Sequence, residues 1–375
     1  MRFSDIIGRK QIVDNLRSMV DSNRMPHALL FVEQPGCGAL AMALATASYL
    51  FCHNRKKGDS CGVCPQCIKT DKLVHLDMHY IFPINTSTVV GKDKREEIDA
   101  FYPLWKEQVL ENPYFNEYDL YKKLGIENKF GTISVSEANA IIRKLSLSSY
   151  EGGDKIMFIM FAERMNQEAA NKLLKSLEEP SHGTYYFLIS HSPSKILPTI
   201  LSRCRIIEVP PVEKELLAER IESDSGLSHS DALSIAEASA GSYGKARELV
   251  EAGAGNDEIF NTFITLLSLS VQKDMVSLFD IWNLLSGWGK EQQKIFCTEG
   301  IAILRKIYMI KLGLENLAYL CGGERDKLVR LSQLLKEDVY LKGYEYLNSA
   351  VDQIERNVNA KFVFCDLCNR FYYIA

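Results

Sequence analysis

An apolar run, a turn with two glycines and an alanine-rich run follow one another between residues 28 and 45. Residues 28–32 have the length of a buried strand, and the run after the turn contains no helix breaker. A strand, a glycine turn and a helix in this order are the surroundings that a phosphate-binding loop requires. The segment therefore predicts the beginning of an α/β domain with a loop of this kind.

The turn itself departs from the G-x-x-x-x-G-K-[ST] pattern of phosphate-binding loops. Glu33 stands at the first glycine, Ala39 at the lysine that reaches the phosphates, and Leu40 at the hydroxyl that holds magnesium. Gly36 and Gly38 still allow a turn with exposed N–H groups. The turn alone leaves open whether it is a coincidence of small residues or a nucleotide site that has been disabled, and also whether a nucleotide binds there without being hydrolysed.

Composition excludes few classes of protein. Hydrophobic residues make up 46% of the 375 residues and charged residues 25%, which is ordinary for a globular protein of two or three domains. The net charge of −4 gives no reason to expect strong autonomous binding to nucleic acid, although a local basic face is compatible with it. We see no signal-peptide core and no run of about 20 apolar residues, so we expect a cytoplasmic protein without a membrane span.

Four cysteines, Cys52, Cys61, Cys64 and Cys67, form a C-x8-C-x2-C-x2-C module. Tetrahedral zinc needs four soft ligands that converge on one point, and C-x2-C steps turn the chain tightly enough to supply them. Without an export signal, clustered cysteines indicate metal ligands before disulfides. We predict a structural zinc site; a set of free or redox-active cysteines is the alternative, and His53 is an awkward ligand beside Cys52.

Three other groups of residues receive plainer interpretations. Cys365 and Cys368 repeat the C-x2-C spacing, but a lone pair in an aromatic helical tail is more typical of core packing. The basic run at 54–58 indicates a solvated loop rather than a DNA contact. The two histidines of residues 75–79 are weak metal candidates.

Strand signals return at residues 155–161 and 184–190, with a helical run at 167–179 between them. Strands separated by helices imply a parallel sheet with helical covers. The polar and aromatic stretch from 83 to about 150 has helical patches and no clean strand, so we interpret it as an insertion. Past residue 211 the strand signals give way to helices.

These patterns predict three domains. The first is an α/β domain over 1–210, which contains the zinc module at 52–67 and the insertion at about 83–150. A small helical domain over 211–254 and an all-α domain over 255–375 follow.

Five motifs carry a resemblance to a known family. They are "PHALLF" before the turn, the cysteine module, "NKLLKSLEEP" at 171–180, "LPTILSRC" at 197–204 and "GSYGKARELV" at 241–250. In this order they resemble the clamp-loader branch of the AAA+ family. The resemblance covers residues 1 to about 250 by specific motifs and the C-terminal third only by helical character. It implies an AAA+-like α/β domain, with residues 211–254 as a small helical lid domain and residues 255–375 as a helical collar domain for oligomerisation.

The resemblance also implies that the turn at 33–40 is a disabled phosphate site and that this chain hydrolyses no ATP in cis. A working ATPase of this type has Asp for magnesium and Glu for water at the end of the 155–161 strand. Here Met160 and Phe161 stand at those positions, and Glu163, two residues on, is expected to face away from the site. The family's second sensor arginine falls at Gly244.

One arginine of the family pattern is retained, Arg203 in "SRC". In clamp loaders the matching arginine reaches across a subunit interface to a neighbour's ATP. Such a trans arginine stabilises charge on the transferring phosphoryl group, an effect of roughly 10³–10⁵ in rate for GTPases. The resemblance favours this finger over a structural arginine paired with a carboxylate such as Glu208. Arg205 is less suitable because it begins the next strand.

The resemblance further implies partners and a task. The chain is expected to be the stator of a hetero-oligomer that contains ATPase subunits of the gamma/tau type and a clamp-opening delta subunit. That assembly loads the sliding clamp onto primed DNA. Two alternatives stay open: an ATPase with atypical nucleotide contacts, and a zinc-bearing module within residues 1–82 that binds single-stranded DNA.

Overall fold

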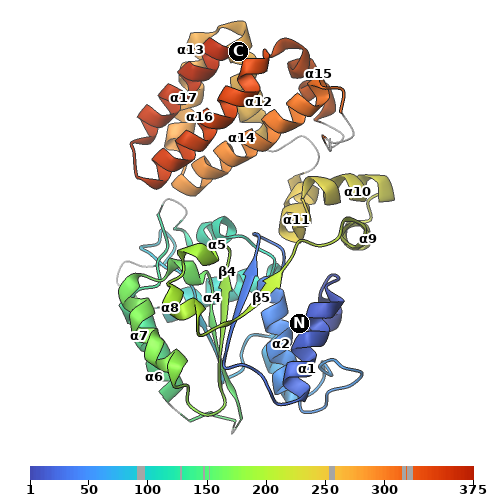
Figure 1. Ribbon diagram of the computed structural model, residues 1–375, viewed down its shortest axis with the longest axis vertical. Helices are drawn as coiled ribbons and strands as arrows, with labels where there is room; N and C mark the ends of the chain where they lie inside the picture. Colours follow the sequence, from blue (N-terminus) through green and yellow to red (C-terminus); the bar gives the residue numbers. More distant parts are fainter. Residues whose placement is uncertain are drawn as a thin grey trace. The chain divides into compact units, whose positions relative to one another are not determined.

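A computed structural model describes residues 1–90, 98–126, 129–146, 148–151, 153–252, 258–314, 318 and 324–375 (Figure 1). The chain separates into two compact units. The first contains residues 1–126, 130–220 and 240–245; the second contains residues 129 and 221–239 and the described residues from 246 onward. The predicted division into three domains stays a prediction.

A five-stranded sheet forms the centre of the first unit, and all its neighbouring strands run parallel. The order across the sheet is β2 (Met78–Ile81), β3 (Lys155–Ile159), β4 (Thr184–Ser190), β1 (Ala28–Glu33) and β5 (Arg205–Val209). In the centre, Leu30 of β1 is paired with Leu188 on one side and Ile206 on the other. The predicted parallel α/β sheet is confirmed, but β2 has no counterpart among the predicted strands.

Helices cover the sheet of the first unit, with α1 and α2 at one side and α6 and α7 at the other (Figure 1). The helices are α1 (Lys10–Asp21), α2 (Ala39–Phe51), α3 (Pro65–Asp71), α4 (Ile98–Glu111), α5 (Glu117–Leu124), α6 (Val135–Ser146), α7 (Gln167–Glu178) and α8 (Pro198–Leu201). Nearly every residue of α2 is buried, as expected of a helix that is apolar all round. The stretch interpreted as an insertion contains α4, α5 and α6, which confirms its helical patches.

The inserted segment is packed onto the edge of the sheet through aromatic side chains. Trp105 of α4 is fully buried. Its ring stacks on Phe82 with centroids 5.4 Å apart, and it lies 4.5 Å from the ring of Tyr80 in β2. Aromatic pairs at such distances contribute beyond the area they bury, so the insertion is an integral part of this unit.

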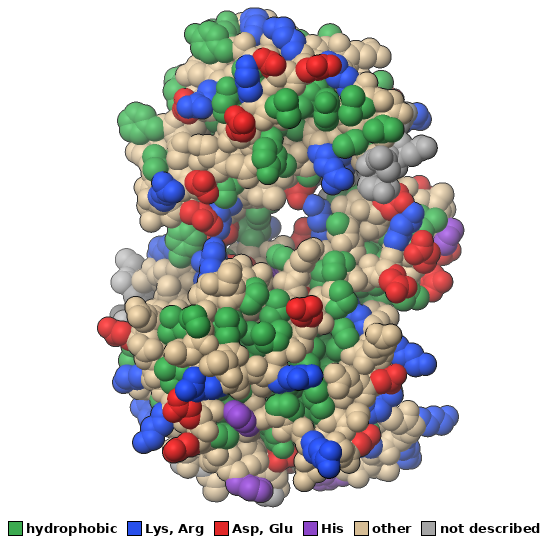
Figure 2. Space-filling view, in the orientation of Figure 1, with side chains coloured by type: hydrophobic (Ala, Val, Ile, Leu, Met, Phe, Trp, Pro, Cys, Tyr) green, Lys and Arg blue, Asp and Glu red, His purple; other side chains and the backbone are tan. Residues whose placement is uncertain are grey.

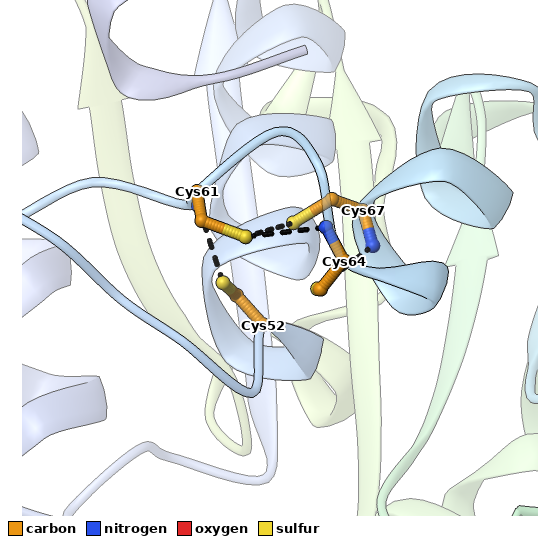
Figure 3. Close-up of side chains that lie close together, drawn as sticks. All are labelled: Cys52, Cys61, Cys64 and Cys67. Carbon is orange, nitrogen blue, oxygen red and sulfur yellow. Dashed lines mark hydrogen bonds between the residues drawn. The ribbon is translucent and has the colours of Figure 1, made fainter.

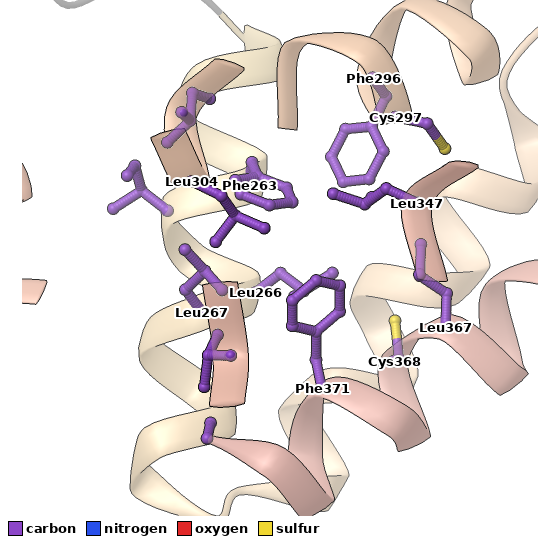
Figure 4. Close-up of a cluster of buried hydrophobic side chains, with 14 of the residues drawn as sticks. Phe263, Leu266, Leu267, Phe296, Cys297, Leu304, Leu347, Leu367, Cys368 and Phe371 are labelled. Atoms are coloured by element: carbon purple, nitrogen blue, oxygen red, sulfur yellow. The ribbon is translucent and has the colours of Figure 1, made fainter. Parts of the chain in front are cut away.

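Helices continue after the sheet, as predicted. They are α9 (Lys214–Ser225), α10 (His229–Ala238), α11 (Tyr243–Ala252), α12 (Glu258–Gln272), α13 (Met275–Gly287), α14 (Lys290–Lys311), α15 (Arg325–Leu334), α16 (Glu337–Glu355) and α17 (Ala360–Ile374). The last six share one core, in which the ring of Phe263 meets those of Phe296 and Phe371 (Figure 4). Cys368 is buried in this core, which confirms the packing interpretation for that cysteine.

Charged side chains of both signs are interspersed on the face of the molecule that Figure 2 shows. Among the residues that the structure describes, no helix combines the length and apolar character of a membrane span.

Candidate functional site

The turn between β1 and α2 contains the two glycines of the predicted loop. Gly36 and Gly38 both have positive φ, +78° and +104°, which a residue with a side chain rarely adopts. Helix α2 begins at Ala39, directly after the second of these glycines. The first N–H groups of a helix carry partial positive charge and bind anions. The predicted strand, turn and helix are therefore confirmed.

Glu33 supplies an anion to this helix from within the chain. Its Oε2 accepts a hydrogen bond from the backbone N–H of Ala39 at 2.8 Å, and the residue is 8% exposed. Ala39 stands at the position of the phosphate-binding lysine. The side chain that replaced the first glycine of the loop therefore occupies the anion-binding end of α2.

His191, which follows β4, contacts the other oxygen of Glu33. Its Nε2 lies 3.3 Å from Glu33 Oε1, and its backbone N–H donates to Glu163 at 3.0 Å. Burial alone lowers the pKa of His191, but the hydrogen bond to Glu33 and the charges of Glu33, Glu163 and Glu117 outweigh burial and raise the pKa above 6.5. A protonated His191 offsets the charge of a carboxylate that is otherwise buried.

The expectation that Glu163 faces away from the site is wrong. The carboxylate of Glu163 accepts a hydrogen bond from the backbone N–H of His191, and the ring of His191 contacts Glu33. Phe161 has a left-handed backbone, with φ at +51°, and the 3-10 helix that follows it (Ala162–Arg164) contains Glu163. Because of this turn, the side chain of Glu163 points in a different direction from the one it would have if β3 continued to residue 163.

Apolar side chains fill the end of β3 where the family pattern has its acidic pair. Met160 and Phe161 are almost fully buried. The ring of Phe161 packs edge-on against the ring of His191, with centroids 5.0 Å apart. Neither side chain has a group that binds magnesium or orients water.

Tyr114 lies over the turn, and it comes from the inserted segment between α4 and α5. A Cβ added to Gly38 would be 2.4 Å from Cε1 of the Tyr114 ring, so the ring packs directly on the glycine backbone. The same ring meets the ring of Tyr243 edge-on at 4.9 Å. Glycine at position 38 is thus required both by its φ and by this close approach.

Residues 242–244 form hydrogen bonds with the backbone of the turn. Ser242 Oγ donates to the carbonyl oxygen of Pro35 at 2.9 Å, and the N–H of Gly244 donates to the carbonyl oxygen of Gly36 at 3.1 Å. A Cβ added to Gly244 would lie 2.1 Å from the carbonyl oxygen of Tyr114. The position of the second sensor arginine is therefore close to the loop, but it has room only for glycine.

The four predicted cysteines converge at the end of α2 and the start of α3 (Figure 3). All four sulfurs lie within 4.8 Å of one another, and those of Cys61 and Cys67 are 3.9 Å apart. Tetrahedral coordination with Zn–S bonds of about 2.3 Å places sulfurs about 3.8 Å apart. The donor set and its spacing fit a metal ion.

Backbone N–H groups surround these sulfurs, as they do around metal-bound thiolates. The N–H groups of Cys61 and Cys64 donate to the sulfurs of Cys52 and Cys61 at 3.2 and 3.3 Å. Hydrogen bonds from the Val63 and Cys64 backbone lower the pKa of Cys61 to about 6, whereas burial raises the pKa of Cys67. A bound metal ion would hold both as thiolates.

Arg203 follows α8, and its side chain is one-third exposed. Its guanidinium forms an ion pair with Glu178 at the end of α7, and Nη1 donates to the carbonyl oxygen of Thr199 at 2.7 Å. A carboxylate partner exists, as the alternative interpretation requires, but it is Glu178 and not Glu208.

Comparison with known proteins identifies the family. The model of the family described as "DNA polymerase III, delta subunit" matches residues 8–213, more than half of the chain. The chain belongs to this DNA polymerase III family. The motif order predicts the delta-prime kind of subunit within the family, and several curated relatives that are named delta-prime subunits confirm this prediction.

This chain matches only part of the length of each of these relatives. DNA polymerase III subunit delta-prime of Escherichia coli (strain K12) is 25% identical over 279 residues, which are 74% of this chain and 69% of that protein. The delta-prime subunit of Bacillus subtilis (strain 168) is 25% identical over 211 residues, 56% of this chain and half of that protein. A crystal structure of a gamma subunit-related protein from Thermotoga maritima, 14% identical, gives a TM-score of 0.43 and covers 96% of this chain and 99% of that one.

The loop brings together one group of the predicted residues. The structure gathers Glu33, Gly36, Gly38, Ala39 and Gly244 there, and it gathers the four cysteines in a separate cluster. Sequence reasoning missed two residues of the loop site, His191 and Tyr114. A lone histidine and one tyrosine within an aromatic stretch form no motif, so no pattern in the sequence singles them out.

Proposed function

We propose that this chain is a delta-prime-type stator of a DNA polymerase III clamp loader. In this role it hydrolyses no ATP itself and presents Arg203 to the ATP site of a neighbouring ATPase subunit. The family match and the delta-prime relatives support the subunit class. The observation that carries the proposal is the loop, in which Glu33 binds the start of α2 where a hydrolysing subunit would bind phosphate.

The position of Arg203 supports its role as the finger. It lies in the turn after α8 with part of its side chain exposed, and its contacts in the chain are Glu178, Thr199 and Ser202. A guanidinium presents several N–H donors in one plane and binds phosphate oxygens through two of them at once. A guanidinium forms charge-assisted hydrogen bonds of the same kind with carboxylates and with phosphates. Arg203 can therefore exchange the carboxylate of Glu178 for a phosphate.

The partners follow from this role. We propose ATPase subunits of the gamma/tau type, a clamp-opening delta subunit, and through them the sliding clamp and primed DNA. The four cysteines would hold zinc, because four thiolates at this spacing suit that ion, and its role would be structural.

The test is the ATPase rate of the reconstituted loader, stimulated by clamp and primed DNA, with wild-type chain and with Arg203→Ala. We expect the rate to fall by about tenfold or more. Arg205→Ala, two residues away at the start of β5, is the matched control and should leave the rate unchanged. Gel filtration verifies that every variant assembles.

An unchanged rate in an intact Arg203→Ala complex would show that the subunit is a scaffold alone. Hydrolysis by the purified chain would instead support the ATPase alternative. Salt-dependent binding of single-stranded DNA by the purified chain would support the DNA-binding alternative.

A further inference from the structure

We propose that the chain fills its own phosphate loop: the carboxylate of Glu33 takes the place of a phosphate, and Tyr114 of the inserted segment closes over it. Lack of hydrolysis requires only that catalytic groups are missing. A filled loop also excludes binding, so the inference goes beyond the proposed function. It gives the inserted segment a task, and it is independent of Arg203.

The first step is the position of the charge. In a phosphate-binding loop the anion lies at the N-terminus of the following helix and accepts its first N–H groups. In this chain the N–H of Ala39 donates to Glu33 Oε2, and the ring of His191 lies beside Oε1. Both carboxylate oxygens therefore have a partner. A phosphate arriving here would meet a like charge that is tethered to the loop and already bound.

The second step is the cover. The Tyr114 ring lies on the backbone of Gly38, and the residue is 6% exposed. Its carbonyl oxygen lies against Gly244 on the same side of the turn, where a Cβ would be 2.1 Å away. The space next to the two glycines, which a phosphate needs for close approach, is thus taken by an aromatic ring and a backbone carbonyl.

The third step is that Tyr114 is held in place from both sides. Its own N–H donates to Asn112 Oδ1 at 3.0 Å, directly after α4. Asn116 caps α5 by accepting the N–H of Asp119 at 3.0 Å. Trp105 anchors α4 against the sheet edge. The tyrosine is therefore positioned by two fixed helices.

The Tyr114 hydroxyl provides a matched control. It is buried and has no hydrogen-bond partner among the described residues. Tyr114→Phe keeps the ring on Gly38 and removes only this hydroxyl. If the Tyr114 ring closes the loop, Tyr114→Phe should behave as wild type, whereas Tyr114→Ala should open the loop.

The experiment measures binding of a fluorescent ATP analogue with Mg²⁺ to the full chain. The restored loop carries Glu33→Gly, Ala39→Lys and Leu40→Thr, either with Tyr114 retained or with Tyr114→Ala added. We expect no binding by wild type, and binding at least about tenfold tighter when Tyr114→Ala accompanies the restored loop than when Tyr114 is retained. Equal binding by the two restored chains, or binding by wild type, overturns the proposal.

A second measurement keeps the proposal falsifiable if the restored chains do not fold. Thermal unfolding is compared with and without millimolar inorganic pyrophosphate for wild type and for Glu33→Ala combined with either Tyr114→Ala or Tyr114→Phe. A bound anion raises the unfolding temperature of the chain that binds it. We expect a rise only for Glu33→Ala combined with Tyr114→Ala. A rise for wild type or for Glu33→Ala with Tyr114→Phe, or none for the folded chain with Glu33→Ala and Tyr114→Ala, overturns the proposal that Glu33 and the Tyr114 ring fill the loop.

Discussion

Arg203 and Glu178 form an ion pair that joins the turn after α8 to the end of α7. The proposed finger is thus bound to a carboxylate of its own chain. Both side chains are at least one-third exposed, and exposed ion pairs contribute only about 0–1 kcal/mol. The pair can therefore give way to a neighbour's triphosphate at small cost.

The first prediction concerns Glu178→Gln. Removing the competing charge frees Arg203 for the neighbour's phosphate, so we expect the loader's ATPase rate at subsaturating ATP to rise, by up to about fivefold. The gain should disappear in the Arg203→Ala background, because the two residues act as one pair. A lower rate for Glu178→Gln would contradict competition and would show that Glu178 holds Arg203 in its working position.

The second prediction concerns the metal. We expect one zinc ion per chain by elemental analysis, and its loss in Cys64→Ser. Since metal binding contributes directly to folding, zinc removal should destabilise the first unit by more than about 2 kcal/mol in chemical unfolding. Cys365→Ser is the control, because it removes a cysteine of the same C-x2-C spacing in α17 and should leave the zinc content unchanged. A chain that is equally stable with and without chelator would argue for free cysteines.

The third prediction concerns pH. The pKa of His191 is raised in the folded chain, chiefly by Glu33 against the opposing effect of burial, with Glu163 and Glu117 also facing it. The stabilisation is therefore complete below pH 6.5 and is lost as pH rises through the higher, folded pKa. Urea unfolding of wild type and Glu33→Gln should differ most at pH 6 and converge at higher pH. A constant difference across this range would show that His191 does not titrate with Glu33.

The sequence predicts those parts of the fold and site that rest on local patterns. The β1–turn–α2 unit follows from an apolar run, two glycines and an alanine-rich run, and the cysteine cluster follows from spacing alone. Strand β2 is only four residues long, at one edge of the sheet, and its sequence MHYI has no clear alternation. A run this short is hard to distinguish from a loop.

The contacts that fill the loop are not predictable in the same way. Glu33 and His191 are 158 residues apart in the chain and meet only because β1 and β4 are neighbours in the sheet. Tyr114 reaches Gly38 only after α4 has packed on the sheet edge. Arg203 is paired with Glu178 rather than with nearby Glu208 because α7 and α8 are in contact. Tertiary structure decides each of these pairs.

The last prediction concerns Gly244→Ala. An added Cβ would meet the carbonyl oxygen of Tyr114 at 2.1 Å, so the backbone must shift, and we expect a loss of roughly 1–3 kcal/mol in unfolding free energy. Gly153→Ala is the control, since nothing lies within 4 Å of a Cβ there.

Because the obstacle is backbone, Tyr114→Ala should not rescue Gly244→Ala. At Gly38 the obstacle is the Tyr114 ring, so shortening the side chain removes that clash and leaves only the strain of a positive φ. Rescue at Gly244 would show that the ring, and not the carbonyl, limits the space where the family has its second arginine.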